Sequence, residues 1–342
     1  MTSPNYIVYH AADLDGKGSA AIALRALRAS ECRCADDAPI LIPMDYNWPD
    51  DPIDAIPDGA CVHMLDFSLP PKSMRRLDAR CLLVWIDHHT PRIREILAGG
   101  PLPNAIIHTA DHSPSACLLT WRHFHPHQAA PSVVMHINEW DTATERTGNR
   151  WDTVVRPLQF GLRSYGLDPD NDLWNILLNV RYVTARSAAD ELVRGICWEG
   201  LAICRYIDQD DRQAVLSSSY PVHCRLDATG CFAPSAEFPD PGQTILTHAL
   251  AINRNPFDPH ILASHPLNAT LPAELLLAWG YDPLARGWRL HVSPGPGALP
   301  TLDAGRLCRK LWNGGGHPGR AGATLPELPA WLLPGRTAED QA

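Results

Sequence analysis

Aspartate and histidine residues follow four apolar segments of this chain. Asp87, His88 and His89 come directly after the apolar run from Cys81 to Ile86. The other three sets are His10, Asp13 and Asp15 after Tyr6–Tyr9, Asp66 after Cys61–Leu65, and Asp141 after Val133–Ile137. A mixed set of carboxylates and imidazoles suits Mn²⁺, since it is softer than an all-oxygen magnesium site and harder than a thiolate zinc site. The residues therefore predict a divalent-metal site.

The segments around these residues alternate between strand-like and helix-like patterns. Runs of bulky apolar residues, such as 82–86, indicate buried strands. The Ala- and Leu-rich segment 18–27 predicts a helix. A further helix is expected to open at Ser68–Pro71, with Ser68 as its cap. This alternation predicts an α/β fold with a parallel sheet covered on both faces, whose site lies at the carboxyl ends of the strands.

The order of these motifs resembles that of the DHH phosphoesterase superfamily. Its members include RecJ-type exonucleases, nanoRNases and pAp phosphatases, cyclic-dinucleotide phosphodiesterases and family II pyrophosphatases. Its four motifs match His10-x-x-Asp13-x-Asp15-Gly16, Asp66, Asp87-His88-His89 and Asp141. The stretch from Gly314 to Gly322 resembles the substrate-binding signature of the DHH-associated C-terminal domain. A lone Asp-His-His tripeptide recurs by chance, whereas five elements in order over most of the chain are specific.

The resemblance implies a role for each of these residues. His10 and Asp13 would bind one metal, Asp15, His88 and Asp141 a second, and Asp66 would bridge the two. Two Mn²⁺ ions, with Mg²⁺ or Co²⁺ as alternatives, would activate a water without a serine or cysteine nucleophile. Asp87 would orient a histidine from outside the ligand set. His89 would face the phosphate, and its alternative is a buried structural histidine. Glu139 and Asp152 are alternatives to Asp141.

The resemblance also implies a substrate site in the C-terminal part. Gly314, Gly315 and Gly316 would let backbone N–H groups approach an anion closely, and His317 would add a hydrogen-bond donor. Arg320 would contact a terminal phosphate or lie in solvent. Relatives often carry an arginine in the preceding strand, where either Arg289 or His291 would substitute.

Length and pattern predict two domains. A chain of 342 residues exceeds the usual size of a single core. We expect an α/β DHH catalytic domain over 1–185, a helical connector over 186–217, a smaller α/β substrate domain over 218–335 and a disordered tail over 336–342.

His123, His125 and His127 stand at the end of a predicted helix and are interpreted as a solvated surface rather than a metal site.

The net charge and the composition indicate which kinds of partner the chain can bind. A net charge of −9 argues against a broad basic surface that binds long duplex nucleic acid. It favours a small nucleotide or a short oligonucleotide as the ligand. No run approaches the ~20 apolar residues of a membrane span, and no signal peptide is visible. The ten cysteines are scattered, as in a reducing cytoplasm. Homodimer formation is left open.

These observations predict a cytoplasmic, Mn²⁺-dependent phosphodiesterase. Its expected substrates are short oligonucleotides or linear and cyclic dinucleotides, cleaved to mononucleotides. The alternative is a phosphomonoesterase acting on pAp, or a pyrophosphate or polyphosphate hydrolase. A nucleotide sensor without catalysis is the rival from another class of protein.

Overall fold

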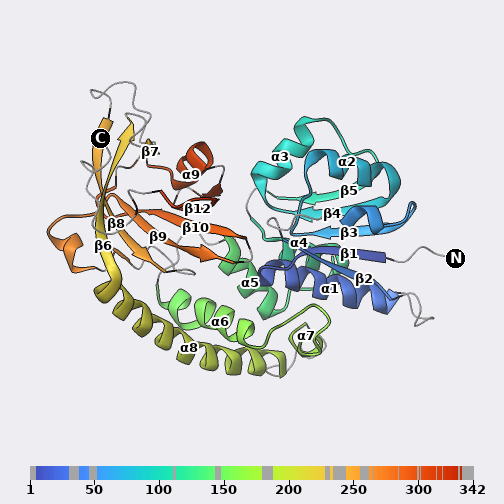
Figure 1. The fold of residues 1–342 in the computed structure, drawn as a ribbon. Coiled ribbons are helices and arrows are strands. Elements are labelled where there is room, and N and C mark those ends of the chain that lie inside the picture. Colours follow the sequence, from blue (N-terminus) through green and yellow to red (C-terminus); the bar gives the residue numbers. More distant parts are fainter. Residues whose placement is uncertain are drawn as a thin grey trace. The chain divides into compact units, whose positions relative to one another are not determined.

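The computed structural model divides the chain into two compact units, Met1–Tyr206 and Ile207–Ala342 (Figure 1). It describes residues 5–30, 38–45, 52–110, 113–142, 148–178, 188–227, 232–233, 244–254, 262–263, 265–283, 285–298, 300, 302–312, 314–317, 319–329 and 332. The division falls within helix α8 (Ala188–Ser218), which occupies most of the predicted connector. The predicted tail, 336–342, lies outside the described residues.

The first unit is built on a five-stranded sheet with the strand order β2-β1-β3-β4-β5. Its strands are β1 (Asn5–His10), β2 (Ile40–Met44), β3 (Cys61–Leu65), β4 (Leu82–Asp87) and β5 (Ala105–Thr109). All neighbouring strands are parallel. The carboxyl ends of these strands therefore meet at the same edge of the sheet, and the predicted α/β class is confirmed.

Helices cover both faces of this sheet, because alternate residues of each strand point to opposite sides. Ile7 and Val84 pack with helix α1 (Leu14–Ser30) and helix α4 (Ala116–Phe124) on one face. Val8 and Trp85 pack on the other face, where helices α2 (Pro71–Arg80) and α3 (Thr90–Ala98) lie (Figure 1).

The described elements that follow α4 in the first unit are helical. They include α5 (Ser132–Thr142), the π-helical turn η3 (Trp151–Val155), α6 (Arg156–Ser164) and α7 (Leu173–Leu177). The fourth apolar segment thus belongs to a helix, α5, and Asp141 lies in its last turn. A short 3-10 turn, η2 (Pro52–Ala55), precedes β3. None of the described helices is long and apolar enough to cross a bilayer.

The second unit contains a seven-stranded sheet with the order β11-β12-β10-β9-β8-β6-β7. Its strands are β6 (Ser219–Asp227), β7 (Phe232–Ala233), β8 (Thr244–Asn253), β9 (Leu275–Asp282), β10 (Gly287–Pro294), β11 (Gly315–His317) and β12 (Arg320–Leu325). Among the described strands of this sheet, only β8 and β9 pair in parallel. Helix α9 (Ala304–Trp312) packs on one face through Leu307 and Cys308, and the 3-10 turn η7 (Pro266–Ala269) precedes β9.

A buried histidine predicts how the stability of the first unit depends on pH. Burial, together with the charge of nearby His123, lowers the pKa of His63 on β3 to about 4. Its Nδ1 is buried without a hydrogen-bond partner in the described residues. An unfolded chain would therefore bind a proton between pH 6.5 and 4 that the folded chain excludes, so stability falls as the pH is lowered through this window, by up to about 3 kcal/mol.

We expect His63→Leu to remove much of this acid-dependent loss. The measurement is urea unfolding of the wild type and the variant between pH 7 and pH 4.5. His127→Leu, at an exposed position of the same unit, is the matched control and should keep the wild-type slope. Equal slopes for all three proteins would contradict the assignment.

Candidate metal centre

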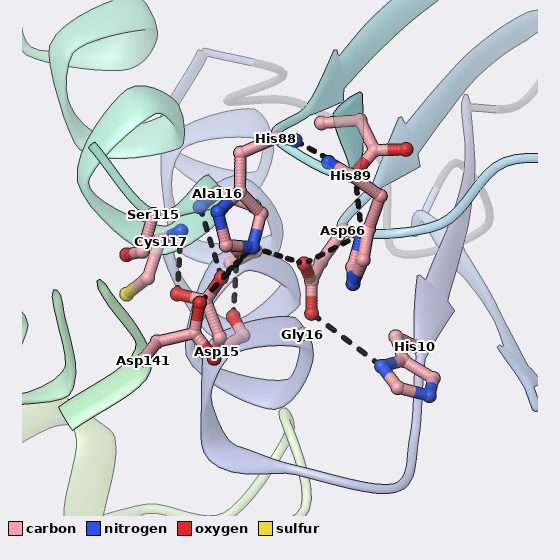
Figure 2. Close-up of polar contacts among 12 residues, drawn as sticks. His10, Asp15, Gly16, Asp66, His88, His89, Ser115, Ala116, Cys117 and Asp141 are labelled. Atoms are coloured by element: carbon pink, nitrogen blue, oxygen red, sulfur yellow. Dashed lines mark hydrogen bonds and ion pairs between the residues drawn. The ribbon is translucent and has the colours of Figure 1, made fainter. Parts of the chain in front are cut away.

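The predicted metal ligands come together at the carboxyl edge of the first sheet (Figure 2). His10 ends β1, Asp66 follows β3, and His88 follows β4. The first turn of α1 and the loop before it supply Asp15 and Asp13, and α5 supplies Asp141. Parallel strands explain this convergence, because the chain leaves each strand at the same edge.

His10, Asp13 and Asp66 form one group. The Nδ1 of His10 lies 3.3 Å from Oδ2 of Asp13 and 3.6 Å from Oδ2 of Asp66. The other oxygen of Asp13 accepts a hydrogen bond of 3.0 Å from the backbone N–H of Gly16, as the capping residue of a helix does. Asp13 therefore caps α1 with one oxygen and faces His10 with the other.

His88, Asp15 and Asp141 form a second group. The Nε2 of His88 lies 3.0 Å from Oδ2 of Asp141 and 3.6 Å from Oδ2 of Asp15. It also lies 3.5 Å from Oδ1 of Asp66. Glu139, an alternative to Asp141, instead forms a 2.8 Å ion pair with Arg150, and the other alternative, Asp152, is exposed in η3.

Asp66 is shared by the two groups through its two oxygens. Oδ2 faces His10 and Oδ1 faces His88, so this carboxylate occupies the position between the groups (Figure 2). Both oxygens are buried, and within the described part of the chain no donor reaches them with hydrogen-bond geometry. The backbone of Asp66 has φ = 55°, a left-handed conformation that aspartate tolerates better than most residues.

The electrostatics of the centre fit cations. Burial opposes ionisation of Asp66, but the imidazoles of His10 and His88 outweigh it and lower its pKa. Burial and the charges of Asp66 and Asp141 raise the pKa of Asp15 well above its usual range. A divalent ion would relieve the repulsion between these carboxylates, and a buried carboxylate without donors offers the lone pairs that an ion needs.

Asp15 also holds the first turn of helix α4. Its Oδ2 accepts a hydrogen bond from the N–H of Ala116 and its Oδ1 one from the N–H of Cys117, each of 2.9 Å. The preceding N–H, of Ser115, donates to the side-chain oxygen of Asn138 at 2.9 Å. Asn138 stands three residues before Asp141 on α5. The start of α4 therefore connects Asp15 with the helix that carries Asp141.

Sequence reasoning missed Asn138. A signal was present, because residues three apart lie on the same side of a helix and Asn138 therefore shares a side with Asp141. We expect Asn138→Ala to loosen α4 against α5 and to weaken metal binding by about 10- to 100-fold, as removal of a supporting residue does. Isothermal titration with Mn²⁺ measures this effect.

Two further variants distinguish a positioning role from general destabilisation. Asn138→Asp retains an acceptor oxygen for Ser115 and should recover most of the affinity. Thr142→Ala removes a hydroxyl that donates to the Asn138 carbonyl in the same helix and should leave the affinity unchanged. Equal losses in all three variants would contradict the positioning role.

The side chain of Asp87 stabilises the Asp-His-His turn by accepting hydrogen bonds. Its Oδ1 accepts hydrogen bonds from the backbone N–H groups of His88, at 2.7 Å, and His89, at 3.1 Å. The same oxygen lies 2.7 Å from Nδ1 of His89. Asp87 thus fixes the turn and the ring of His89, which is 38% exposed and so can be reached by a ligand.

The predicted cap Ser68 has a different role. Its hydroxyl donates to Oδ2 of Asp87 and accepts from the indole N–H of Trp85 at 3.1 Å. Helix α2 begins after Pro70, which makes no side-chain cap hydrogen bond. The cap prediction is wrong because Ser68 still lies at the sheet edge, where the buried Asp87 supplies a stronger acceptor.

The predicted substrate residues lie in the second unit. Arg289 and His291 are two residues apart on β10 and so face the same side of the sheet. Arg289 forms a 2.8 Å ion pair with Asp282. Arg320 begins β12 and pairs in the ladder with His317 of β11.

Close packing explains two of the three adjacent glycines. A Cβ on Gly314 would lie 2.2 Å from the carbonyl oxygen of Gly322, and a Cβ on Gly316 would lie 2.5 Å from Cα of Ala321. Gly315 has open space around it and is exposed. The signature is therefore partly a requirement of the β11–β12 hairpin, and Gly315 is its accessible member.

Comparisons with known proteins give structural likenesses only. No family model and no curated protein matches the sequence. The pGpG-specific phosphodiesterase PggH of Vibrio cholerae is 11% identical with a TM-score of 0.44, and 94% of this chain and 93% of that chain are covered. An exopolyphosphatase-related protein of Bacteroides fragilis is 12% identical with a TM-score of 0.41, with 95% and 88% covered. RecJ of Thermus thermophilus, in complex with Mg²⁺, is 16% identical with a TM-score of 0.39, with 94% and 47% covered. At TM-scores below 0.5, the function has to be argued from the site itself.

Proposed function

We propose that this chain is a metal-dependent phosphoesterase of the DHH type that hydrolyses phosphodiester bonds in short oligonucleotides or in linear and cyclic dinucleotides. The observation that carries the proposal is the position of Asp66 between two groups of ligands, with one buried oxygen facing each. A buried carboxylate that presents one oxygen to each group could serve as a ligand to both ions of a two-metal centre.

The donor set favours two Mn²⁺ ions, with Mg²⁺ or Co²⁺ as alternatives. Bound ions would supply an activated water and would neutralise charge on the phosphoryl oxygens. His10, Asp13 and Asp66 would hold one ion, and Asp15, His88, Asp141 and Asp66 would hold the other.

The remaining residues of the site act on the substrate or on the turn. Asp87 holds Nδ1 of His89 and thereby fixes the ring. Although burial opposes it, the carboxylates of Asp87 and Asp66 raise the pKa of His89, and in the protonated ring Nε2 would donate to a phosphoryl oxygen. His89 would in this way place a positively charged hydrogen-bond donor beside the metals without itself binding a metal.

The net charge of the chain supports the proposed class of substrate. A net charge of −9 suits a small anion bound in a focused site better than a long polyanion. Gly315, His317 and Arg320 of the second unit remain the residues that we expect to contact a substrate. Cys81, Cys117, Cys197 and Cys308 are free thiols, which agrees with the cytoplasmic location that we infer. Homodimer formation remains compatible with these features.

The test is hydrolysis of a substrate panel in the presence of Mn²⁺. The panel contains pGpG, longer RNA oligomers, cyclic dinucleotides, pAp and pyrophosphate. His88→Ala is assayed alongside, and Tyr281→Ala, an exposed position of the second unit, is the control. We expect turnover of dinucleotides that His88→Ala abolishes and Tyr281→Ala retains.

Other outcomes separate the alternatives. Turnover of pAp or pyrophosphate alone would support the phosphomonoesterase or pyrophosphatase alternative and would reject the diesterase. Tight nucleotide binding without turnover under Mn²⁺, Mg²⁺ or Co²⁺ would reject the enzyme and leave a sensor.

A further inference from the structure

Two histidines that are not among the proposed metal ligands face each other. His108 lies on β5, an edge strand of the first sheet, and His123 lies in the last turn of α4. The Nε2 of His108 is 3.0 Å from the Nδ1 of His123. Their ring centroids are 4.6 Å apart and the ring planes are inclined by 58°.

This geometry allows the two facing nitrogens to bind the same metal ion. Zn²⁺ binds imidazole nitrogens at about 2.0–2.1 Å, which in a tetrahedral site places two such nitrogens ~3.3 Å apart. The distance of 3.0 Å between the two nitrogens would have to increase by only a few tenths of an ångström. Both side chains are half-buried, so His123 does not belong to the solvated surface predicted for it. Solvent still reaches the pair, and water can complete the coordination.

The ring of His123 is in the form that binds metals. Burial and the neighbouring His108 lower the pKa of His123, so its ring is neutral at pH 7. Without a metal, one ring donates its N–H to the other. Binding requires that this proton move, through solvent, to the other nitrogen of the same ring, so that both facing nitrogens present a lone pair and no net proton is released.

We propose that His108 and His123 form a separate site for a borderline divalent ion such as Zn²⁺ or Cu²⁺, which joins strand β5 to helix α4. The site takes a softer ion than the carboxylate-rich centre, because both of its protein ligands are imidazoles. It does not depend on the proposed phosphoesterase activity.

The position of the site gives it a structural consequence. Helix α4 is nine residues long, and its first turn is held by Asp15. His123 lies at the other end of the same helix. An ion at the histidine pair would therefore fix the second end of the helix whose first end supports a catalytic ligand.

Binding of Cu²⁺ to the full chain tests the proposal. The background is the double variant Asp66→Asn, His88→Ala, in which the carboxylate-rich centre lacks two of its ligands. Electron paramagnetic resonance is expected to show one Cu²⁺ with two equatorial nitrogens. Adding either His108→Gln or His123→Gln should remove this pattern and raise the dissociation constant at least tenfold. His127→Gln, at an exposed position, is the matched control and should change neither.

Zn²⁺ supplies a second readout in the otherwise wild-type chain. Melting temperatures are measured in EDTA and then with Zn²⁺, which also shows that each variant folds. We expect Zn²⁺ to raise the melting temperature of the wild type and of His127→Gln by more than that of His108→Gln or His123→Gln. A Cu²⁺ spectrum and a Zn²⁺ shift that are the same in all of these proteins would overturn the site, whatever the panel assay shows about phosphoester hydrolysis.

Discussion

Asp66→Asn is expected to reduce Mn²⁺-supported turnover by at least about 1,000-fold, equivalent to ~4 kcal/mol in the activation barrier. The amide has one oxygen and carries no negative charge. It can therefore face either His10 or His88 as an acceptor, but not both. Loss of one shared ligand weakens both metal positions together, which no other single substitution in the centre does.

The same substitution should leave the folded chain intact. Asparagine adopts a positive φ as readily as aspartate, so the backbone at φ = 55° is tolerated. Removing the negative charge lowers the repulsion with Asp15 but also removes the attraction to His10 and His88 that lowers the pKa of Asp66. We therefore expect a folded protein with a somewhat lower melting temperature in EDTA, together with lost turnover.

Two measurements check this prediction, the rate of hydrolysis and the stoichiometry of Mn²⁺ binding. Asp54→Asn is the control, because Asp54 lies in η2 and forms an exposed ion pair with Arg76. Turnover within tenfold of the wild type for Asp66→Asn would show that the carboxylate is not shared by two ions. It would thereby remove the basis for a two-metal centre.

The convergence of most of the candidate ligands could be predicted because they stand at strand ends or beside the start of a helix. Asp141 instead lies in the last turn of α5, and its place in the set was implied only by the family resemblance. Asp66 and His88 follow apolar runs that indicate buried strands, and parallel strands bring their ends to one edge. Helix α1 begins at Leu14, earlier than the helix predicted over 18–27, so Asp15 lies in its first turn and not before it. Short-range pattern and one topological rule were sufficient for Asp66 and His88.

The supporting contacts could not be predicted in the same way, because they join segments that are far apart in sequence. Ser68 reads locally as a helix cap, and only the neighbouring strand β4 brings Asp87 to its hydroxyl. Asn138 reads as a polar helix residue until α4 is placed against it. The glycine signature likewise reads as an anion loop, whereas its packing against β12 accounts for Gly314 and Gly316. Side-chain partners depend on tertiary packing, which local pattern does not encode.

Gly16→Ala is expected to destabilise the first unit by at least about 2 kcal/mol and to abolish metal binding. A Cβ at this position would lie 2.0 Å from the carbonyl oxygen of His10, which is backbone and has no rotamer to adopt. Helix α1 would have to move away from the end of β1. That movement separates Asp13 and Asp15, on the helix side, from His10, on the strand side.

Gly195→Ala is the matched control for this substitution. Gly195 lies within helix α8, and nothing lies within 4 Å of the place that its Cβ would occupy. The change should therefore stabilise the chain by roughly 0.5–1 kcal/mol through helix propensity. Urea unfolding and Mn²⁺ titration of both variants give the comparison.

The outcome decides why the first motif contains a glycine. If Gly16→Ala retained wild-type stability and affinity, α1 would not be seated on β1 as closely as the contact with His10 requires. The first group of ligands would then be assembled in another way. If Gly16→Ala instead lowers the stability while Gly195→Ala raises it, the close approach of α1 to β1 is what requires Gly16. The metal centre would then depend on this glycine only because it depends on that approach.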